Sequence, residues 1–150
     1  MKLVLYIAIF ISTFSFYWSS SNYIENRTEA EDVYEYALMI EDGKDHPWFF
    51  HKHHLIYAPL IKGFYDTVKF LGSDIDSLGI MRLVSSLSAV VTLFFFFLFC
   101  YKRFSLRPVS SLLATVFYGF SYGFWRYAAE AEIPLLASAF ITAALYFATA

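Results

Sequence analysis

A run of nineteen residues without a formal charge, Leu83–Tyr101, constrains this chain more than any other feature. It contains four consecutive phenylalanines and is bounded by Arg82 on one side and by Lys102 and Arg103 on the other. About 20 apolar residues in a helix cross the hydrocarbon core of a bilayer, because each residue advances the helix by ~1.5 Å. The run therefore predicts a transmembrane helix.

Three further stretches are almost free of charge: Leu3–Trp18, Val109–Trp125 and Ile133–Ala150. Apolar types make up 59% of the chain and charged types 16%, whereas soluble domains run near ~45–50% and ~25%. We therefore expect an all-α polytopic membrane protein, with four transmembrane helices in a single membrane domain over residues 1–150. Because the last stretch has no polar flank, we also expect the N-terminal part of a longer protein.

The first of these stretches has a second interpretation, since sixteen residues also fit the apolar core of a signal peptide. It ends in the bulky residues Phe16, Tyr17 and Trp18 rather than in the small residues of a cleavage site. That ending favours an uncleaved membrane anchor.

Cysteine and charge content exclude several other classes of protein. With Cys100 as the single cysteine, the chain can form no intrachain disulfide and no cysteine cluster for a metal. A formal net charge of −2 gives no reason to expect nucleic-acid binding. The sequence also lacks a glycine-rich phosphate loop and an H-E-x-x-H zinc motif.

Basic residues in the short connectors predict which side of the membrane each end faces. The connector after the second stretch carries three basic residues and no acid: Lys102, Arg103 and Arg107. We place it in the cytoplasm together with the N-terminus and Lys2. Ser19–Leu78 then forms a large extracytoplasmic loop with eleven acids against five basic residues, and Arg126–Glu132 lies on the same outer side. The expected location is the cell inner or plasma membrane.

The outer loop is rich in aromatic residues and should fold into amphipathic helices that lie on the membrane surface. Thr28 and Glu31 have the spacing of a capping box, which opens a first helix. Its apolar positions recur at helical spacing: Val33, Ala37 and Ile40. Gly43 should end it.

A second helix is expected over His54–Leu71. Its predicted buried face consists of Leu60, Phe64, Val68 and Leu71. The charged residues Lys62, Asp66 and Lys69 should point away from that face.

Two acidic pairs are the main candidates for chemistry. Glu31 suits the first turn of a helix as a cap, but Asp32 is less well explained in that way. Glu130 and Glu132 lie in the turn between two apolar stretches, where an ionisable residue close to the hydrocarbon is costly and is by default a functional hypothesis. The two could share a divalent cation, or could simply mark the end of the membrane.

Two further candidates could meet a phosphate or a metal. Arg126 could bind a phosphate or a lipid headgroup. His51 and His54 would share a helix face, which suits a metal pair, although an interfacial histidine cluster is the simpler interpretation.

Two segments resemble a known family. The segment AEDVYEYALMIEDGKDHPWFFHKHHLIYAPL, which follows one apolar stretch, resembles the first outer loop of polytopic glycosyltransferases of the GT-C class. The likeness is to the protein O-mannosyltransferase-like and aminoarabinose-transferase-like families. The segment SYGFWRYAAEAEIPLL is similar to a second signature of such families, a tryptophan followed by an acid at the outer end of the third span.

The resemblance implies transfer of a sugar from a polyprenyl-phosphate donor to a glycan, lipid or protein acceptor on the extracytoplasmic face. Asp32 takes the place of the catalytic base, although many relatives have the order Asp-Glu where this chain has Glu31 before Asp32. Glu130 and Glu132 take the place of a second acidic motif that in some members holds a metal ion or the donor phosphate, and His54 falls in the His-His-Leu stretch.

Two other functions stay open on the sequence. The chain could be a non-catalytic membrane protein whose outer loop binds a partner during assembly, or a fragment of a transporter with Glu130 and Glu132 as cation or proton sites. The isolated 150 residues hold only four apolar stretches. We expect four transmembrane helices to be too few to close an active site.

Overall fold

The computed structural model describes residues 2–23, 30–47, 49–50, 55–131 and 133–149. Within these ranges the chain is helical and contains no strand, which confirms the all-α prediction. The helices run in this order: α1 Lys2–Ser21, α2 Ala30–Asp42, the 3-10 helix η1 Gly43–Asp45, α3 Tyr57–Phe70, α4 Ser77–Leu98, the π-helix η2 Phe99–Arg103, α5 Pro108–Gly119, α6 Tyr122–Ala129 and α7 Pro134–Ala148.

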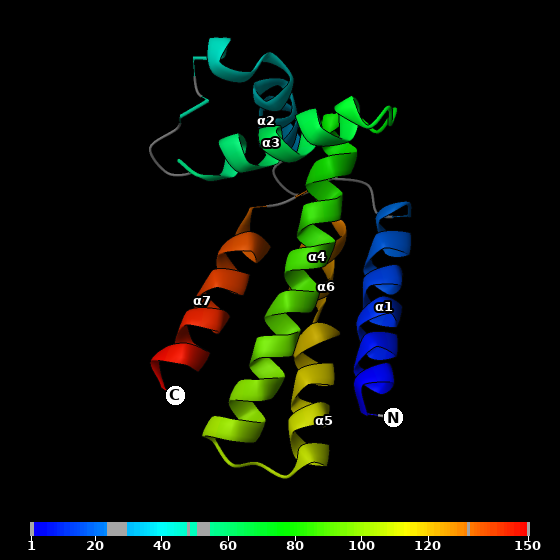
Figure 1. Ribbon diagram of the computed structural model, residues 1–150, viewed down its shortest axis with the longest axis vertical. Helices are drawn as coiled ribbons and strands as arrows, with labels where there is room; N and C mark the ends of the chain where they lie inside the picture. Colours follow the sequence, from blue (N-terminus) through cyan, green and yellow to red (C-terminus); the bar gives the residue numbers. More distant parts are fainter. Residues whose placement is uncertain (1, 24–29, 48, 51–54, 132, 150) are drawn as a thin grey trace.

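A bundle is formed by α1, α4, α5, α6 and α7, and α2 and α3 cover one end of it (Figure 1). α4 lies at the centre, α1, α5, α6 and α7 run alongside it, and α2 and α3 lie across the end where α4 begins. We call this covered end the acidic end, because eleven of the thirteen acids lie between Glu25 and Asp76. The opposite end, where Phe104–Arg107 joins η2 to α5, is called the basic end.

The charge-free run around which the sequence is organised forms the longest helical stretch. Asp76 caps α4, since its carboxylate accepts a hydrogen bond of 2.7 Å from the backbone N–H of Gly79. Helix then continues through η2, so that Ser77–Arg103 spans 27 residues. Among the described residues, this stretch alone is long and apolar enough to cross a membrane by itself. Four transmembrane helices therefore stay a prediction.

The third apolar stretch differs from expectation, because Val109–Trp125 forms two helices rather than one. α5 ends at Gly119, and α6 begins after Ser121, whose backbone is extended and whose hydroxyl donates to the carbonyl of Tyr118. α6 and α7 reach the length and apolarity of a span only as one pair bent by 115°.

Gly119 is required where α5 meets its neighbours. A methyl group at this position would lie 2.9 Å from a Leu93 methyl and 3.0 Å from the Tyr17 hydroxyl. Its carbonyl accepts a hydrogen bond of 3.0 Å from that hydroxyl. The absence of a side chain thus lets α1, α4 and α5 approach one another closely.

Two buried hydrophobic clusters hold the structure together. The acidic-end cluster joins α2, α3, α4 and the segment after α6 through Val33, Ala37, Ile40, Tyr57, Ile61, Ile80, Met81, Val84 and Ala131. The bundle cluster joins α1, α4, α6 and α7 through Tyr17, Ala89, Val90, Leu93, Phe124, Ala128 and Leu135.

The first loop helix agrees with its predicted pattern. Val33, Ala37 and Ile40 are all buried in the acidic-end cluster. α2 ends at Asp42, and Gly43 follows with a φ of 67°, a left-handed conformation that favours glycine. The predicted capping box rests on Thr28, which lies outside the described residues.

The second loop helix exists, and the prediction of its buried face was wrong at Phe64 and Leu71 but not at Val68, which packs against the acidic-end cluster. Tyr57, Ala58 and Ile61 are buried, whereas Phe64 is 50% exposed and Leu71 is 75% exposed. The helix carries two apolar stripes, and α2 and α4 pack against the one that contains Ile61. Sequence spacing alone could not choose between the two stripes.

Candidate functional site

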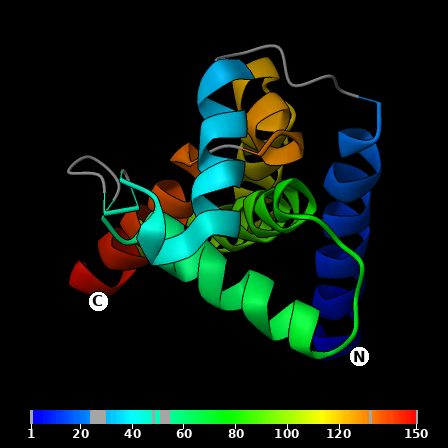
Figure 2. The ribbon, with the colours of Figure 1, turned by 90° about the horizontal axis from the view of Figure 1, so that it is seen from above.

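The acidic end brings together the two segments that carry the candidate acids. Val33, which follows Asp32, and Ala131, which lies between Glu130 and Glu132, belong to the same acidic-end cluster. Figure 2 looks onto this end and shows α2 lying across the bundle on the side of α6. The start of α2 and the segment that holds Glu130 and Ala131 therefore lie at one end of the molecule.

The structure describes the predicted site residues to different extents. Glu31 and Asp32 lie in the first turn of α2, but their side chains are outside the described part of the chain. Glu132 and His54 are themselves outside the described residues. Arg126 and Glu130 are described in full, and they contact each other.

Three side chains form a row along one face of α6 and its C-terminal cap. Nη1 of Arg126 donates a hydrogen bond of 2.9 Å to the Tyr122 hydroxyl. Nη2 of the same guanidinium lies 2.8 Å from Oε1 of Glu130 in an ion pair. The spacing of four residues between successive members brings them onto one side of the helix. Both terminal nitrogens of the Arg126 guanidinium therefore have a partner.

Glu130 is the only buried carboxylate among the described residues. Its side chain is 0% exposed, while that of Arg126 is 21% exposed. Within the described part of the chain, the ion pair with Arg126 is the contact that balances the charge of this carboxylate. A carboxylate that is removed from water needs such a partner, because an unpaired buried charge is costly.

Polar contacts with α4 fix the elements around this row. The hydroxyl of Ser86 donates a hydrogen bond of 2.9 Å to the carbonyl of Ala128, which ties α6 to α4 just before Glu130. The hydroxyl of Ser77 donates one of 2.7 Å to Oε1 of Glu41, which ties the end of α2 to the start of α4. α4 therefore sets the relative positions of both acid-bearing segments.

The predicted metal site has no counterpart among the described side chains. They include no group of three or more histidine, cysteine or acidic residues that could hold a metal ion. The side chains of Asp32, Glu132 and His54 lie outside the described part of the chain, so the divalent ion stays a prediction.

An apolar groove runs along the bundle between α1, α4 and α5. Its volume is about 380 Å³, and its lining includes Phe10, Tyr17, Leu93, Phe94, Val116 and Phe120. The Tyr17 hydroxyl in this lining already donates its hydrogen bond to the carbonyl of Gly119. The groove therefore offers mainly hydrocarbon contacts, which suit an alkyl chain.

Sequence reasoning identified Arg126 and Glu130 but missed Tyr122. The signal was present, because Tyr122, Arg126 and Glu130 repeat at intervals of four residues. It also missed that Glu130 is buried against α6 rather than exposed in a polar turn.

Comparisons with protein-family models, with curated proteins and with solved structures gave no match to this chain.

Proposed function

We propose that this chain forms part of a membrane glycosyltransferase that takes a sugar from a polyprenyl-phosphate donor and transfers it to an acceptor hydroxyl on the extracytoplasmic face. The observation that carries the proposal is the shared burial of Val33 and Ala131. It supports a site in which the acids of the loop and of the turn act together.

The proposed reaction is a direct displacement at the anomeric carbon. The acceptor oxygen forms the new bond to that carbon, and the bond between the carbon and the phosphate oxygen breaks. The Asp32 carboxylate takes the proton of the acceptor hydroxyl as general base. The phosphate leaves on its lipid with the electron pair of the broken bond.

Arg126 is proposed to stabilise the negative charge of the leaving phosphate. A guanidinium has five N–H donors, and the described contacts of Arg126 use Nη1 and Nη2 toward Tyr122 and Glu130. The remaining N–H donors of the guanidinium are proposed to bind the phosphate. Glu130 is then a positioning residue, because its fully buried carboxylate pairs with the Arg126 guanidinium and keeps it in place.

The groove between α1, α4 and α5 supports a lipid-linked donor rather than a soluble one. Its lining is apolar, and one wall is the helix that is long enough to cross a membrane. A polyprenyl chain could lie there while its phosphate reaches the acidic end.

Asp32→Asn in the full-length protein tests the proposal. Native membrane vesicles that contain the protein would receive polyprenyl-phosphate mannose or aminoarabinose with a radiolabelled sugar, and transfer to endogenous lipid, glycan and protein would be counted. Loss of a general base lowers transfer by about 100-fold or more. Glu35→Gln is the matched control, because Glu35 is an exposed carboxylate on the same helix.

Glu31→Gln distinguishes the two members of the acid pair. If Glu31 is the base, this variant loses activity and Asp32→Asn keeps it. Equal transfer by the wild type and by both variants would remove the loop acids from the mechanism and favour a non-catalytic binding protein.

A further inference from the structure

The basic end carries a cluster of cations that the proposed transferase does not use. It consists of Lys102, Arg103 and Arg107, and α1 begins at the same end (Figure 1). From Ser77 to Ala129 the sequence contains no acid, so no carboxylate in α4, α5 or their connector can neutralise the cluster. Every acid of the chain lies in the segments 25–76 and 130–132.

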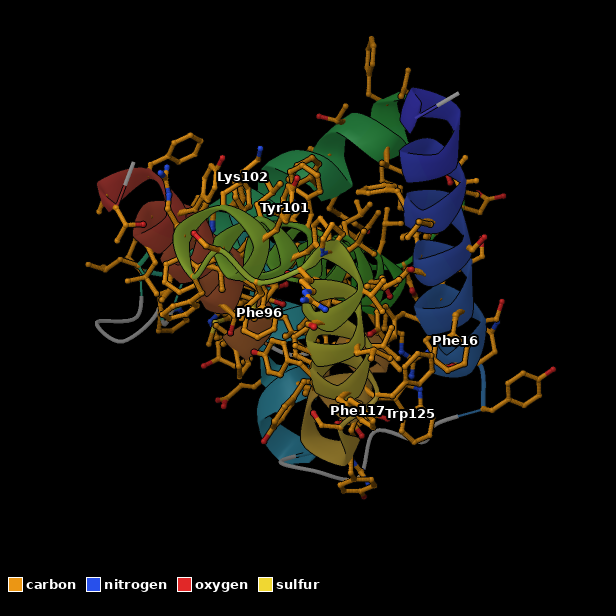
Figure 3. All side chains as sticks on the ribbon, turned by 90° about the horizontal axis from the view of Figure 1, so that it is seen from below. Phe16, Phe96, Tyr101, Lys102, Phe117 and Trp125 are labelled. Carbon is orange, nitrogen blue, oxygen red and sulfur yellow. The ribbon has the colours of Figure 1, made fainter. Side chains whose placement is uncertain are left out.

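The three cations of the connector differ in what they contact. Arg103 is anchored to Tyr146 by two contacts. Its Nε donates a hydrogen bond of 3.3 Å to the Tyr146 carbonyl, and its guanidinium lies 4.8 Å from the centroid of the Tyr146 ring. Lys102 lies 4.7 Å from the Tyr101 ring and is exposed, as is Arg107. Figure 3 views the molecule from this end and labels Lys102 and Tyr101 where the chain leaves α4.

Large apolar side chains alternate with these cations and are also exposed. Phe104 is 63% exposed, Leu106 is 39% exposed and Val109 is 68% exposed. In water such a patch is unfavourable, whereas at the boundary between headgroups and acyl chains it becomes buried. The alternation of apolar and basic side chains is the pattern of a segment that inserts into an anionic membrane surface.

We propose that the basic end, through Lys102 and Arg107 with the apolar side chains between them, binds the phosphate headgroups of anionic phospholipids. Arg103 positions this segment by holding it against α7. The interaction does not depend on the proposed transferase activity. Anionic lipid is favoured, because its acyl chains would also cover Phe104, Leu106 and Val109.

A binding assay on the full-length protein in dodecyl maltoside micelles tests this proposal. The probes are phosphatidylglycerol and phosphatidylcholine that carry the same fluorescent acyl chain, and fluorescence anisotropy gives their dissociation constants. The wild type should bind phosphatidylglycerol more tightly than phosphatidylcholine. Lys102→Gln with Arg107→Gln should weaken phosphatidylglycerol binding by about fivefold for each cation removed, with no change for phosphatidylcholine.

The control variant Lys62→Gln with Lys69→Gln removes two cations at the acidic end and should leave both constants unchanged. A second measurement uses the wild type alone and does not depend on whether a variant folds. Raising the ionic strength from about 0.01 M to about 1 M shortens the Debye length to ~3 Å. This change should remove the preference for phosphatidylglycerol. Equal affinity for the two lipids, or an equal loss in both double variants, would overturn the proposal. Displacement of the probe by oligouridylate or an acidic peptide more readily than by unlabelled phosphatidylglycerol would also overturn it.

Discussion

The charged side chains at the two ends of the molecule have different surroundings. At the acidic end, Glu130 is buried against Arg126, and Glu41 accepts a hydrogen bond from Ser77. At the basic end, Lys102 and Arg107 are exposed and have no acid nearby in the sequence. Glu130 and Glu41 each have a specific partner, and Glu130 is buried, while Lys102 and Arg107 form part of an exposed surface.

This difference indicates where a defined site can exist. Catalysis needs groups that are held in one geometry by their surroundings, and the acidic end provides this for the guanidinium of Arg126. A surface that binds lipid headgroups needs only charge and accessible apolar side chains. Substitutions at the two ends should therefore have different consequences.

The largest effect on stability is expected from Glu130→Gln. The change leaves Arg126 without its anionic partner in a largely buried site and should lower the free energy of unfolding by about 3 kcal/mol. Reversible unfolding in mixed micelles of dodecyl sulfate and dodecyl maltoside would measure it. Lys102→Gln at the basic end is the counterpart and should change stability by less than ~0.5 kcal/mol. Similar losses in both variants would remove the distinction between the ends.

A smaller effect is expected from truncating the buried stripe of α3. Ile61 is 0% exposed in the acidic-end cluster, so Ile61→Ala should destabilise the protein by about 2–3 kcal/mol. Phe64→Ala removes a larger side chain from the exposed stripe and should cost less than ~1 kcal/mol in detergent. The same unfolding assay applies. A larger loss in Phe64→Ala would mean that α3 packs through the face that the sequence predicted.

Loss of the cap of α4 should have an effect of about 1 kcal/mol. Asp76→Ala removes the acceptor for the backbone N–H of Gly79 at the acidic end. Helix content from circular dichroism and the unfolding midpoint would both report it. Asp74→Ala, at an exposed acid two residues earlier, is the control and should change neither quantity. Equal behaviour of the two variants would contradict the assigned cap.

The smallest effect is expected from a partly exposed ion pair. Lys62 and Asp66 lie 2.9 Å apart at a spacing of four residues on α3, and their side chains are 25% and 58% exposed. Asp66→Asn, which keeps the second contact of Lys62 with the carbonyl of Glu41, should lower stability by only about 0.3–0.5 kcal/mol, and less at high salt. A loss of stability as large as that of Glu130→Gln would show that burial does not make the Arg126–Glu130 pair the stronger of the two.

Much of the fold was readable from the sequence because helical periodicity and charge-free length are local properties. The long helix around Leu83–Tyr101, the face of α2 and its end at Gly43 all follow from such local signals. The face of α3 and the break after Gly119 depend on which neighbours pack there, so the sequence could not supply them.

The site was predictable to a smaller extent. Arg126 and Glu130 were identified by their position next to an apolar stretch, but the burial of Glu130 depends on contacts between α4 and α6 that are distant in sequence. The part of the site that involves Asp32, Glu132 and His54 stays a prediction, because their side chains lie outside the described residues.

Cysteine labelling in sealed vesicles tests the central claim most directly, namely that the loop and the turn face one side of a membrane and the connector faces the other. In a Cys100→Ser background, Asp42→Cys, Pro134→Cys and Ser105→Cys each place one thiol at an exposed position. A membrane-impermeant maleimide should label positions 42 and 134 from the same side and position 105 only from the opposite side. Labelling of positions 42 and 134 from opposite sides would contradict the account.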